Sequence, residues 1–310
     1  MGGQQRIYKQ KISSTQTLAK VFRAMEMIAA SRIGGARRAA QEQGPIQDAL
    51  TRAVGAVAAH ADLDHPLLSD RHDTPRAAVL AVASDRGMAG AYSATILRAT
   101  EKLLEDLKSR GKEPVLYTSG RRAAAYFRFR GIEVERSWEG ESDSPSQETT
   151  DEIASELLER FTDPSLHGGV SEVHLVYTRF KSMVTLIPEV RQMLPLAVVD
   201  ASETGQTPTG ADQEAIETGG DAFPEYEFIP SPEAVLDQLL PLYMKGRIRD
   251  VLLQSAASEL ASRQRAMHTA TDNAEDLITK YTRLANSARQ AEITTEINEI
   301  VGGADALVKG

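Results

Sequence analysis

Cysteine is absent from all 310 residues of the chain. Disulfides and thiolate catalysis are therefore excluded, as is usual in a reducing compartment. No apolar run approaches the roughly 18 residues that a bilayer-spanning helix needs. Aromatic residues make up only 5% and the net charge is −9, which together argue against nucleic-acid binding. The remaining composition, 41% hydrophobic and 25% charged, is typical of a globular protein.

Proline is missing from Leu242 onward, and glycine is rare there. Apolar residues in this part recur at alternating steps of three and four, the a/d spacing of a coiled-coil seam. The predicted seam consists of Met267, Ala270, Ala274, Leu277, Tyr281, Leu284 and Ala288. A helix from about Ser231 to Val301 would be on the order of 100 Å long. Such a rod must protrude, pair with another helix or lie inside a partner.

The first segment, to about Pro45, carries a second pattern of this kind. Its predicted seam comprises Ile7, Leu18, Val21, Met25 and Ile28, widened by Phe22 and Ala29. After Pro45 the helix is expected to resume with a bend. Residues 1 to 44 hold eight basic and two acidic residues, or +6, which leaves −15 for the rest. This imbalance indicates either an acidic partner surface for the first helix or merely a solvated charged face.

Between Pro75 and Val199 the hydrophobic period changes to that of a small α/β domain. Strands are expected at 77–83, 114–117 and 132–134, and helices at about 96–107, 120–130 and 148–161. Strands at 173–180 and 184–187 lie too close together for a crossover, which predicts an antiparallel hairpin at one edge. Residues 200–221 are rich in Gly, Thr, Asp and Glu and are predicted to be a mobile acidic loop.

Two stretches could carry chemistry, and each has a simpler interpretation. The turn at 85–90 (DRGMAG) follows a strand and precedes a helix, where a phosphate loop would lie, but it lacks GxGxxG. His60, His65 and His72, interleaved with aspartates, could hold a metal, but their spacing matches no familiar ligand pattern. No catalytic Ser-His-Asp set is present. We predict no cofactor, no metal site and no catalytic residue.

The two terminal segments resemble the gamma subunit of the F-type ATP synthase, in a bacterial, actinobacterial-like form. Residues 293–306 (ITTEINEIVGGADA) match the signature [IV]-T-x-E-x-x-[DE]-x-x-x-G-A-x-[SA] at every constrained position. Residues 24–32 (AMEMIAASR) are close to the family's AMEMVAASK. Shorter family segments follow in order at 84–87, 194–196, 226–228, 270–274 and 288–291. The resemblance covers essentially the whole chain.

The resemblance implies a rotor shaft without catalytic activity of its own. The paired helices would lie along the axis of a hexamer of alpha and beta subunits, and the α/β domain would rest on the epsilon subunit and the c-subunit ring. Contacts with the hexamer are expected from Arg23, Met25, Ile28, Arg32, Arg289, Gln290, Ile293, Thr294, Glu296 and Glu299. Arg37 and Arg38 would also face its acidic loops. Tyr226 and Phe228 are expected to make the foot contact.

The resemblance also places the chain peripherally at the cytoplasmic face of a bacterial cell membrane, held there through the complex. Two departures stand out. The acidic segment 200–221 is longer than the usual connection, and the cysteines of some members are missing, which excludes thiol regulation.

We therefore predict an α/β fold plus a long antiparallel coiled coil of the N- and C-terminal helices, flanking a small Rossmann-like domain. The expected segments are a helix at 1–60, a linker at 61–75, the α/β domain at 76–199, an acidic loop and foot segment at 200–230, and a helix at 231–310. The final turns of the C-terminal helix should project beyond its partner. A coiled-coil scaffold with an unrelated regulatory module and a phosphate-loop enzyme are the alternatives.

Overall fold

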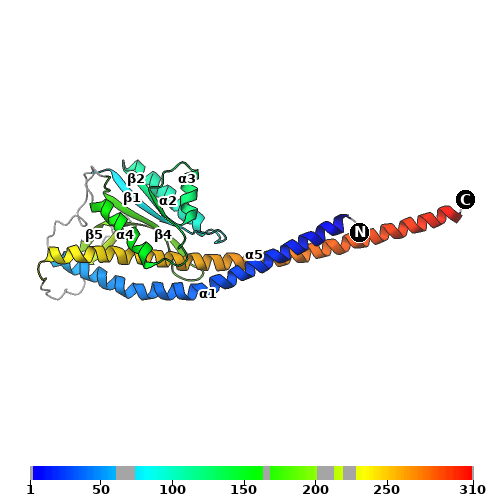
Figure 1. Ribbon diagram of the computed structural model, residues 1–310, viewed down its shortest axis with the longest axis horizontal. Helices are drawn as coiled ribbons and strands as arrows, with labels where there is room; N and C mark the ends of the chain where they lie inside the picture. The colour runs from blue at the N-terminus through cyan, green and yellow to red at the C-terminus, as the bar shows by residue number, and fades with distance from the viewer. Residues whose placement is uncertain (1–2, 61–73, 163–167, 201–212, 219–227, 309–310) are drawn as a thin grey trace. The chain divides into compact units, whose positions relative to one another are not determined.

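The computed structural model of the chain describes residues 3–60, 74–162, 168–200, 213–218 and 228–308. The chain forms two compact units: unit 1 comprises Met1–Ala29 and Arg263–Gly310, and unit 2 comprises Ala30–Ser262. Two long helices, α1 (Gly3–His60) and α5 (Pro232–Val308), contribute residues to both units (Figure 1). Among the residues described, no helix is both long enough and apolar enough to cross a bilayer.

Unit 2 is built on a six-stranded sheet with the order β3-β2-β1-β4-β5-β6. The strands are β1 (Arg76–Val82), β2 (Glu113–Ser119), β3 (Arg136–Trp138), β4 (Glu172–Phe180), β5 (Leu186–Asp200) and β6 (Gln213–Thr218). Strand β1 pairs in parallel with β2 and β4, and β2 pairs in parallel with β3. Strand β5 is antiparallel to β4 and parallel to β6. The central strands therefore follow the βαβ order predicted from the sequence.

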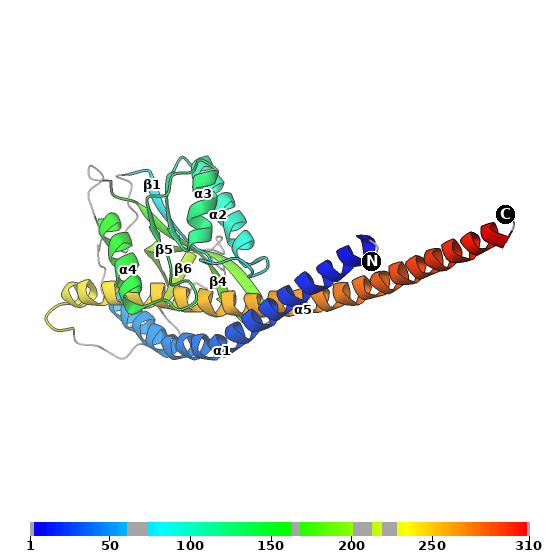
Figure 2. The ribbon, with the colours of Figure 1, turned by 45° about the vertical axis from the view of Figure 1, so that its right-hand side comes forward.

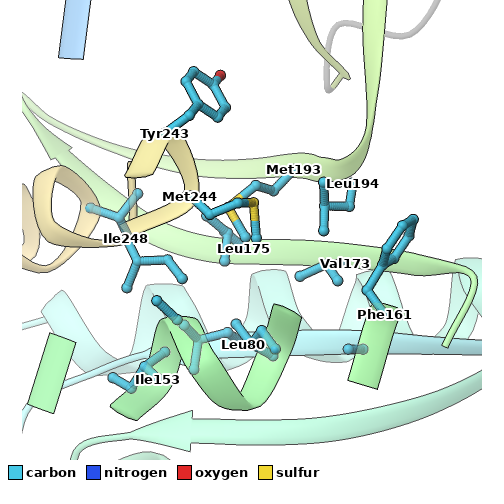
Figure 3. Packing of buried hydrophobic residues seen from close by; sticks show 14 of the residues in the cluster. Leu80, Ile153, Phe161, Val173, Leu175, Met193, Leu194, Tyr243, Met244 and Ile248 are labelled. Atoms are coloured by element: carbon cyan, nitrogen blue, oxygen red, sulfur yellow. The ribbon is translucent and has the colours of Figure 1, made fainter. Parts of the chain in front are cut away.

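Helices cover both faces of this sheet. Helices α2 (Tyr92–Ser109) and α3 (Arg121–Phe129) pack on one face through a cluster that includes Ile96, Leu104 and Phe127. Helix α4 (Gln147–Thr162) and the first part of α5 pack on the other. Figure 3 shows Leu80 of β1, Ile153 of α4 and Ile248 of α5 meeting in that second core. Strand β1 lies between the two clusters and is buried along six of its seven residues, as its uninterrupted apolar run predicts.

Three sequence predictions in this part are wrong. The third strand lies at Arg136–Trp138, not 132–134, because the N–H groups of Arg130, Gly131 and Ile132 still close the end of α3. The hairpin of β4 and β5 is antiparallel as predicted, but β6 and not β5 is the edge strand. Strand β6 at 213–218 also lies within the segment predicted to be an unpacked acidic loop. The rest of 201–221 lies outside the described residues.

Both long helices contain a proline without ending there. Pro45 lies inside α1 and Pro241 inside α5. The first helix therefore runs on through Pro45, in line with the helix predicted at 1–60. Each proline removes one N–H donor and crowds the preceding turn, so packing against the rest of unit 2 must offset that cost. On the α5 side, Leu236, Leu240, Tyr243 and Met244 around Pro241 are fully buried.

A partly buried ionic cluster lies at the amino ends of β2 and β4. The Glu172 carboxylate is 2.8 Å from His174 Nε2 and 2.8 Å from Lys112 Nζ, and Lys112 also donates to Ser171 Oγ. The hydrogen bond with His174, helped by Lys112 and opposed by burial, lowers the Glu172 pKa from 4.5 to about 2. The folded chain therefore holds this carboxylate charged at pH values where the unfolded chain protonates it.

This shift predicts a stability loss in acid. A depressed carboxylate pKa stabilises the fold above the unfolded pKa of 4.5 and loses that contribution as pH falls toward 2. The full shift is worth about 3 kcal/mol, of which less than half should remain at pH 3. We expect the difference in urea-unfolding free energy between the natural chain and Glu172→Gln to shrink accordingly from pH 6 to pH 3. A difference that does not change with pH would contradict the ion-pair assignment.

Candidate interaction surface

In unit 1, the N-terminal part of α1 and the C-terminal part of α5 pair as antiparallel helices. The Tyr8 ring stacks on Tyr281 with centroids 6.4 Å apart, and Lys11 Nζ lies 5.3 Å from the same Tyr281 centroid. Further along, Arg23 Nη2 is 2.6 Å from Glu275 Oε1, and Glu26 is 3.1 Å from His268. Rising numbers on α1 meet falling numbers on α5, so the predicted antiparallel coiled coil is present (Figures 1 and 2).

The seam between these helices is displaced by one residue from much of the predicted seam. The seam consists of less exposed positions, namely Gln5, Tyr8, Ile12, Thr15, Ala19, Phe22, Glu26 and Ala29 on α1, and Met267, Thr271, Ala274, Ile278, Tyr281, Ala285, Ala288 and Glu292 on α5. Both sets follow steps of three and four. The positions predicted correctly are Phe22, Ala29, Met267, Ala274, Tyr281 and Ala288, and the predicted Met25 and Ala270 are half-buried beside the seam. In contrast, Leu277 and Leu284 are 42% and 37% exposed.

The bulky residues expected in the α1 seam instead form an exposed apolar flank. Ile7, Leu18, Val21 and Ile28 are each 46–56% exposed, while their neighbours in the chain enter the seam. Leu277 and Leu284 occupy the corresponding positions on α5. We call these six residues the outer flank. Removal of large aliphatic side chains from water lowers the free energy of the system. The outer flank is therefore a surface suited to contact with a partner.

The seam assignment can be tested with two adjacent substitutions. Ile278→Lys puts a charge into the seam, and we expect it to lower the free energy of unfolding of unit 1 by about 2 kcal/mol. Leu277→Lys places the same side chain on the outer flank and should cost less than about 0.5 kcal/mol. Loss of the circular dichroism signal at 222 nm on heating measures both. A larger decrease in the free energy of unfolding for Leu277→Lys than for Ile278→Lys would support the seam predicted from the sequence.

The contact residues predicted on α1 are not all free for a partner. Arg23 is held by Glu275, as described above, and Met25 is half-buried beside the seam. Ile28, at 56% exposed, belongs to the outer flank. Arg32 falls in unit 2, where its Nη1 lies 2.7 Å from Asp143 Oδ2. Exposed ion pairs contribute little to stability, so an acidic partner could recruit these guanidinium groups at low cost.

The contact residues predicted on α5 lie on its last turns, apart from those on α1. Arg289 is 14 positions beyond Glu275, the partner of Arg23, or about 21 Å along the helix. Arg289, Gln290, Ile293, Glu296 and Glu299 are all exposed. The Thr294 hydroxyl donates to the Gln290 carbonyl at 2.9 Å, which leaves the amide of the Gln290 side chain outside that bond.

Among the described residues of unit 1, no helix pairs with the end of α5. Every residue from Ile293 to Val301 is exposed, including Ile297, Ile300 and Val301 at 54–72%. Figures 1 and 2 show this red stretch running on past the N-terminus, as the sequence predicted. The aliphatic side chains of an unpaired helix can be buried only by contact with another surface.

The turn at 85–90 is committed to structure rather than to a phosphate. The Asp85 carboxylate accepts hydrogen bonds from the N–H groups of Arg121 and Ser142 at 3.0 and 2.9 Å. Burial opposes its charge, but hydrogen bonds from the Gly140, Ser142 and Arg121 backbones and from Ser142 Oγ lower the Asp85 pKa below its usual value. Ser262 Oγ donates to the Ala89 carbonyl at 2.7 Å. Hydrogen bonds at both ends of the turn therefore tie it to other parts of unit 2.

Of the two predicted foot residues, only Phe228 belongs to the part of the chain that the structure describes. Tyr226 lies outside the described residues, and Phe228 is half-buried against the core that contains Leu236 and Tyr243. His65 and His72 also lie outside the described residues. Among the residues that the structure describes, no group of three or more His, Asp or Glu side chains could hold a metal ion.

A hollow of about 490 Å³ in unit 2 lies between α1, α5 and the loop after β3. Three arginines line it, Arg32, Arg38 and Arg249. Arg249 is tied to the carbonyls of Pro145 and Ser146 at 2.7 and 2.9 Å. The hollow is open and basic, which is more typical of a contact surface for another protein than of an enclosed substrate pocket.

A comparison with known proteins assigns this arrangement to a family. The family model described as ATP synthase matches residues 4–307. The ATP synthase gamma chain of Beutenbergia cavernae is 60% identical over 307 residues, which cover 99% of each chain. The chain belongs to the ATP synthase gamma chain family. The gamma chain of Acidothermus cellulolyticus is 53% identical over 308 residues, covering 99% of this chain and 98% of that one.

Solved structures support the fold of this gamma chain family member. A chain of the Euglena gracilis mitochondrial ATP synthase (OSCP, F1 and c-ring) has a TM-score of 0.62 at 14% identity, covering 99% of this chain and 95% of that one. A chain of the Tetrahymena thermophila mitochondrial ATP synthase central stalk and c-ring has a TM-score of 0.54 at 18% identity, covering 81% and 99%. At such identities the likeness concerns the fold, namely an α/β domain with long terminal helices.

Proposed function

We propose that this chain is the central-stalk rotor (gamma) subunit of an F-type proton-translocating ATP synthase. It would couple rotation driven by proton flow to ATP synthesis at the catalytic beta subunits. The observation that carries the proposal is the bare end of α5: nine consecutive exposed residues, 293–301, continue a helix beyond its partner. A collar of surrounding subunits would cover the aliphatic side chains that this helix leaves in water.

Coupling requires that the shaft present different surfaces in different directions. The outer flank supplies aliphatic contacts, whereas Arg23 and Arg289 supply positive charge from other positions. Three identical sites around such a shaft would each meet a different surface, and the contacts that favour one conformation of a site would change as the shaft turns. Differential contact of this kind is the physical requirement for shifting nucleotide affinity by rotation.

In this proposal the chain contributes no catalytic group of its own. Asp85, the charged residue at the candidate phosphate turn, is already engaged by backbone N–H groups. The partners would be the alpha and beta subunits around the coiled coil, and the epsilon subunit and the c ring at the foot, where Phe228 and Tyr226 are the proposed contacts. The chain would lie at the cytoplasmic face of a bacterial cell membrane, held peripherally through the complex.

The test is the ATPase activity of matching alpha and beta subunits, measured with and without the full chain. The chain alone serves as the blank. We expect a stable complex, a rise in turnover of on the order of tenfold or more, since couplings of this kind are worth about 1–3 kcal/mol, and no activity in the blank. A complex that does not form, with unchanged turnover, would favour a coiled-coil scaffold. Activity in the blank would revive the phosphate-loop enzyme.

A matched pair of variants sharpens this test. Ile28→Lys charges the outer flank, and Val184→Lys charges an exposed aliphatic residue of unit 2, which is 75% exposed. Both should fold, because neither side chain is buried. Only Ile28→Lys is expected to weaken the complex with alpha and beta subunits, since it alone changes the proposed contact surface.

A further inference from the structure

Helix α3 presents an exposed stripe of arginines around one phenylalanine. Ala123, Ala124 and Phe127 face the sheet and are buried. The opposite side carries Arg121, Arg122, Ala125, Arg128 and Phe129, spaced i, i+1, i+4, i+7 and i+8, which places them on one face of a helix. We call these five residues the α3 stripe. Figure 2 shows α3 on the outside of unit 2, beside α2.

The charge of the α3 stripe is largely uncompensated. Helix α3 contains no acidic residue. Arg121 Nε lies 3.7 Å from Asp85, a long contact for an ion pair, and Arg130 at the end of the helix is held by Glu101 at 2.9 Å. Within the part of the chain that the structure describes, neither Arg122 nor Arg128 has a carboxylate within ion-pair distance. Two guanidinium groups are therefore available to an anionic partner in a chain whose net charge is −9.

Phe129 is the most exposed large hydrophobic residue of those described, at 90%. It ends α3, while its neighbour Phe127 is fully buried in the core. Replacement of Phe129 by a polar residue would therefore leave the buried core unchanged. A fully exposed ring flanked by arginines combines the two components by which an interfacial helix binds a bilayer, an apolar wedge and cations beside it.

We propose that the α3 stripe binds the surface of a bilayer that contains anionic phospholipids. Arg122 and Arg128 would contact headgroup phosphates, and Phe129 would enter the boundary between headgroups and acyl chains. A lipid surface accepts a lone protruding ring without a shaped pocket, whereas a protein partner would have to supply a cavity that fits it. The proposal goes beyond the proposed function, which needs only contacts with protein subunits.

Binding should be weak and electrostatic for the isolated chain. Each arginine near an anionic surface contributes about fivefold to the partition coefficient, and insertion of one phenylalanine contributes about tenfold. The attraction falls off over about 10 Å at 0.1 M salt. Binding should therefore require anionic lipid and disappear at high ionic strength, because the acidic remainder of the chain is repelled by the same surface.

The experiment is co-sedimentation of the full chain with vesicles, at 25 mM and 500 mM salt. One set of vesicles contains about one-third phosphatidylglycerol, and the other contains only phosphatidylcholine. We expect binding to the first set at low salt and none to the second. Arg122→Gln with Arg128→Gln should lower the partition coefficient about 25-fold, and Phe129→Ser about tenfold. Circular dichroism checks that each variant is folded.

Matched controls decide whether the α3 stripe itself is the contact. Lys102→Gln with Lys108→Gln removes two exposed positive charges from the adjacent helix α2, and Val184→Ser removes another exposed aliphatic side chain. Both controls should retain binding to within about twofold of the natural chain. Equal losses in the lysine control would overturn the proposal, because binding would then follow net charge and not the stripe. Absence of binding to the anionic vesicles would overturn it as well.

A second measurement separates lipid from a protein partner in the assembled complex. A photoreactive benzophenone amino acid in place of Phe129 is introduced into the complex reconstituted in phosphatidylglycerol vesicles. Irradiation is expected to yield a lipid adduct at position 129, detected by mass spectrometry. An adduct with a polypeptide and none with lipid would assign the α3 stripe to a protein interface and reject the bilayer. Because the vesicle assay contains no other subunit, its outcome does not depend on the proposed function.

Discussion

Replacement of Gly120 by alanine is expected to destabilise unit 2 by more than about 4 kcal/mol, or to prevent its folding altogether. Gly120 joins β2 to α3 with a backbone φ of +102°, and a Cβ atom there would lie 2.2 Å from the Ala83 carbonyl oxygen. The surrounding bonds leave no room for adjustment. Gly120 N–H donates to the Trp138 carbonyl at 2.7 Å, and Arg122 N–H donates to the Ser84 carbonyl at 3.0 Å.

Gly140 provides the matched control for this prediction. Its φ of +105° is almost the same, but a Cβ atom there would meet nothing within 4 Å. Gly140→Ala therefore carries the conformational strain alone, about 1–2 kcal/mol. The difference between the two variants in urea-unfolding free energy isolates the steric clash. Equal costs would mean that the end of β1 can move away from Gly120, and that the close approach does not hold unit 2 together.

The parts of the fold that were predicted correctly are those with an unambiguous hydrophobic period. The buried run at 77–83 has no polar residue to suggest another structure, and β1 occupies most of it. The segment at 132–134 alternates in the same way as a short strand, yet the Ile132 N–H donates to the Phe127 carbonyl and closes α3. Local alternation does not reveal such competition between a helix end and a strand, because both leave Ile132 and Val134 partly buried.

The seam was misplaced because each shaft helix carries two apolar stripes. Adjacent pairs such as Leu18 and Ala19, or Leu284 and Ala285, fit a heptad equally well in either phase. In these two pairs the prediction chose the bulkier member, Leu18 or Leu284, but both are exposed, and Ala19 and Ala285 lie in the seam instead. Small seam residues let two helices approach closely. Burial of the smaller residues leaves Leu18 and Leu284 exposed, which costs free energy unless another surface covers them.

The candidate surface was therefore predicted only in part. The family signature pointed to the last turns of α5, and those residues are exposed as a partner contact requires. The outer-flank residues Leu277 and Leu284 were missed, since their hydrophobicity was attributed to the seam. The ion pairs of Arg23 and Arg32 could not be foreseen either, because Glu275 and Asp143 lie far away in the sequence. These helices contain more apolar residues per turn than a single seam requires. Counting them would have indicated the second surface.

Removal of the residues after Glu292 is the other change for which we expect a large effect. The truncation should reduce stimulation of the ATPase without reducing the stability of the chain. Residues 293–301 are exposed and Glu292 is the last half-buried position of the seam, so the truncation should change the free energy of unfolding by less than about 0.5 kcal/mol. Stimulation of the ATPase of alpha and beta subunits should fall by on the order of tenfold, equivalent to about 1.4 kcal/mol of coupling free energy.

A deeper truncation gives the comparison that this prediction needs. Ending the chain after Leu277 also removes Ile278, Tyr281, Ala285 and Ala288 from the seam, which leaves the Tyr8 ring without its stacking partner. That variant should lose helical signal as well as stimulation, because the start of α1 then has nothing to pair with. If the chain that ends at Glu292 stimulates turnover as fully as the complete chain, the bare end of α5 is not the coupling element. The outer flank would then have to transmit rotation by itself, and substitutions of Leu277 and Leu284 would become the decisive variants.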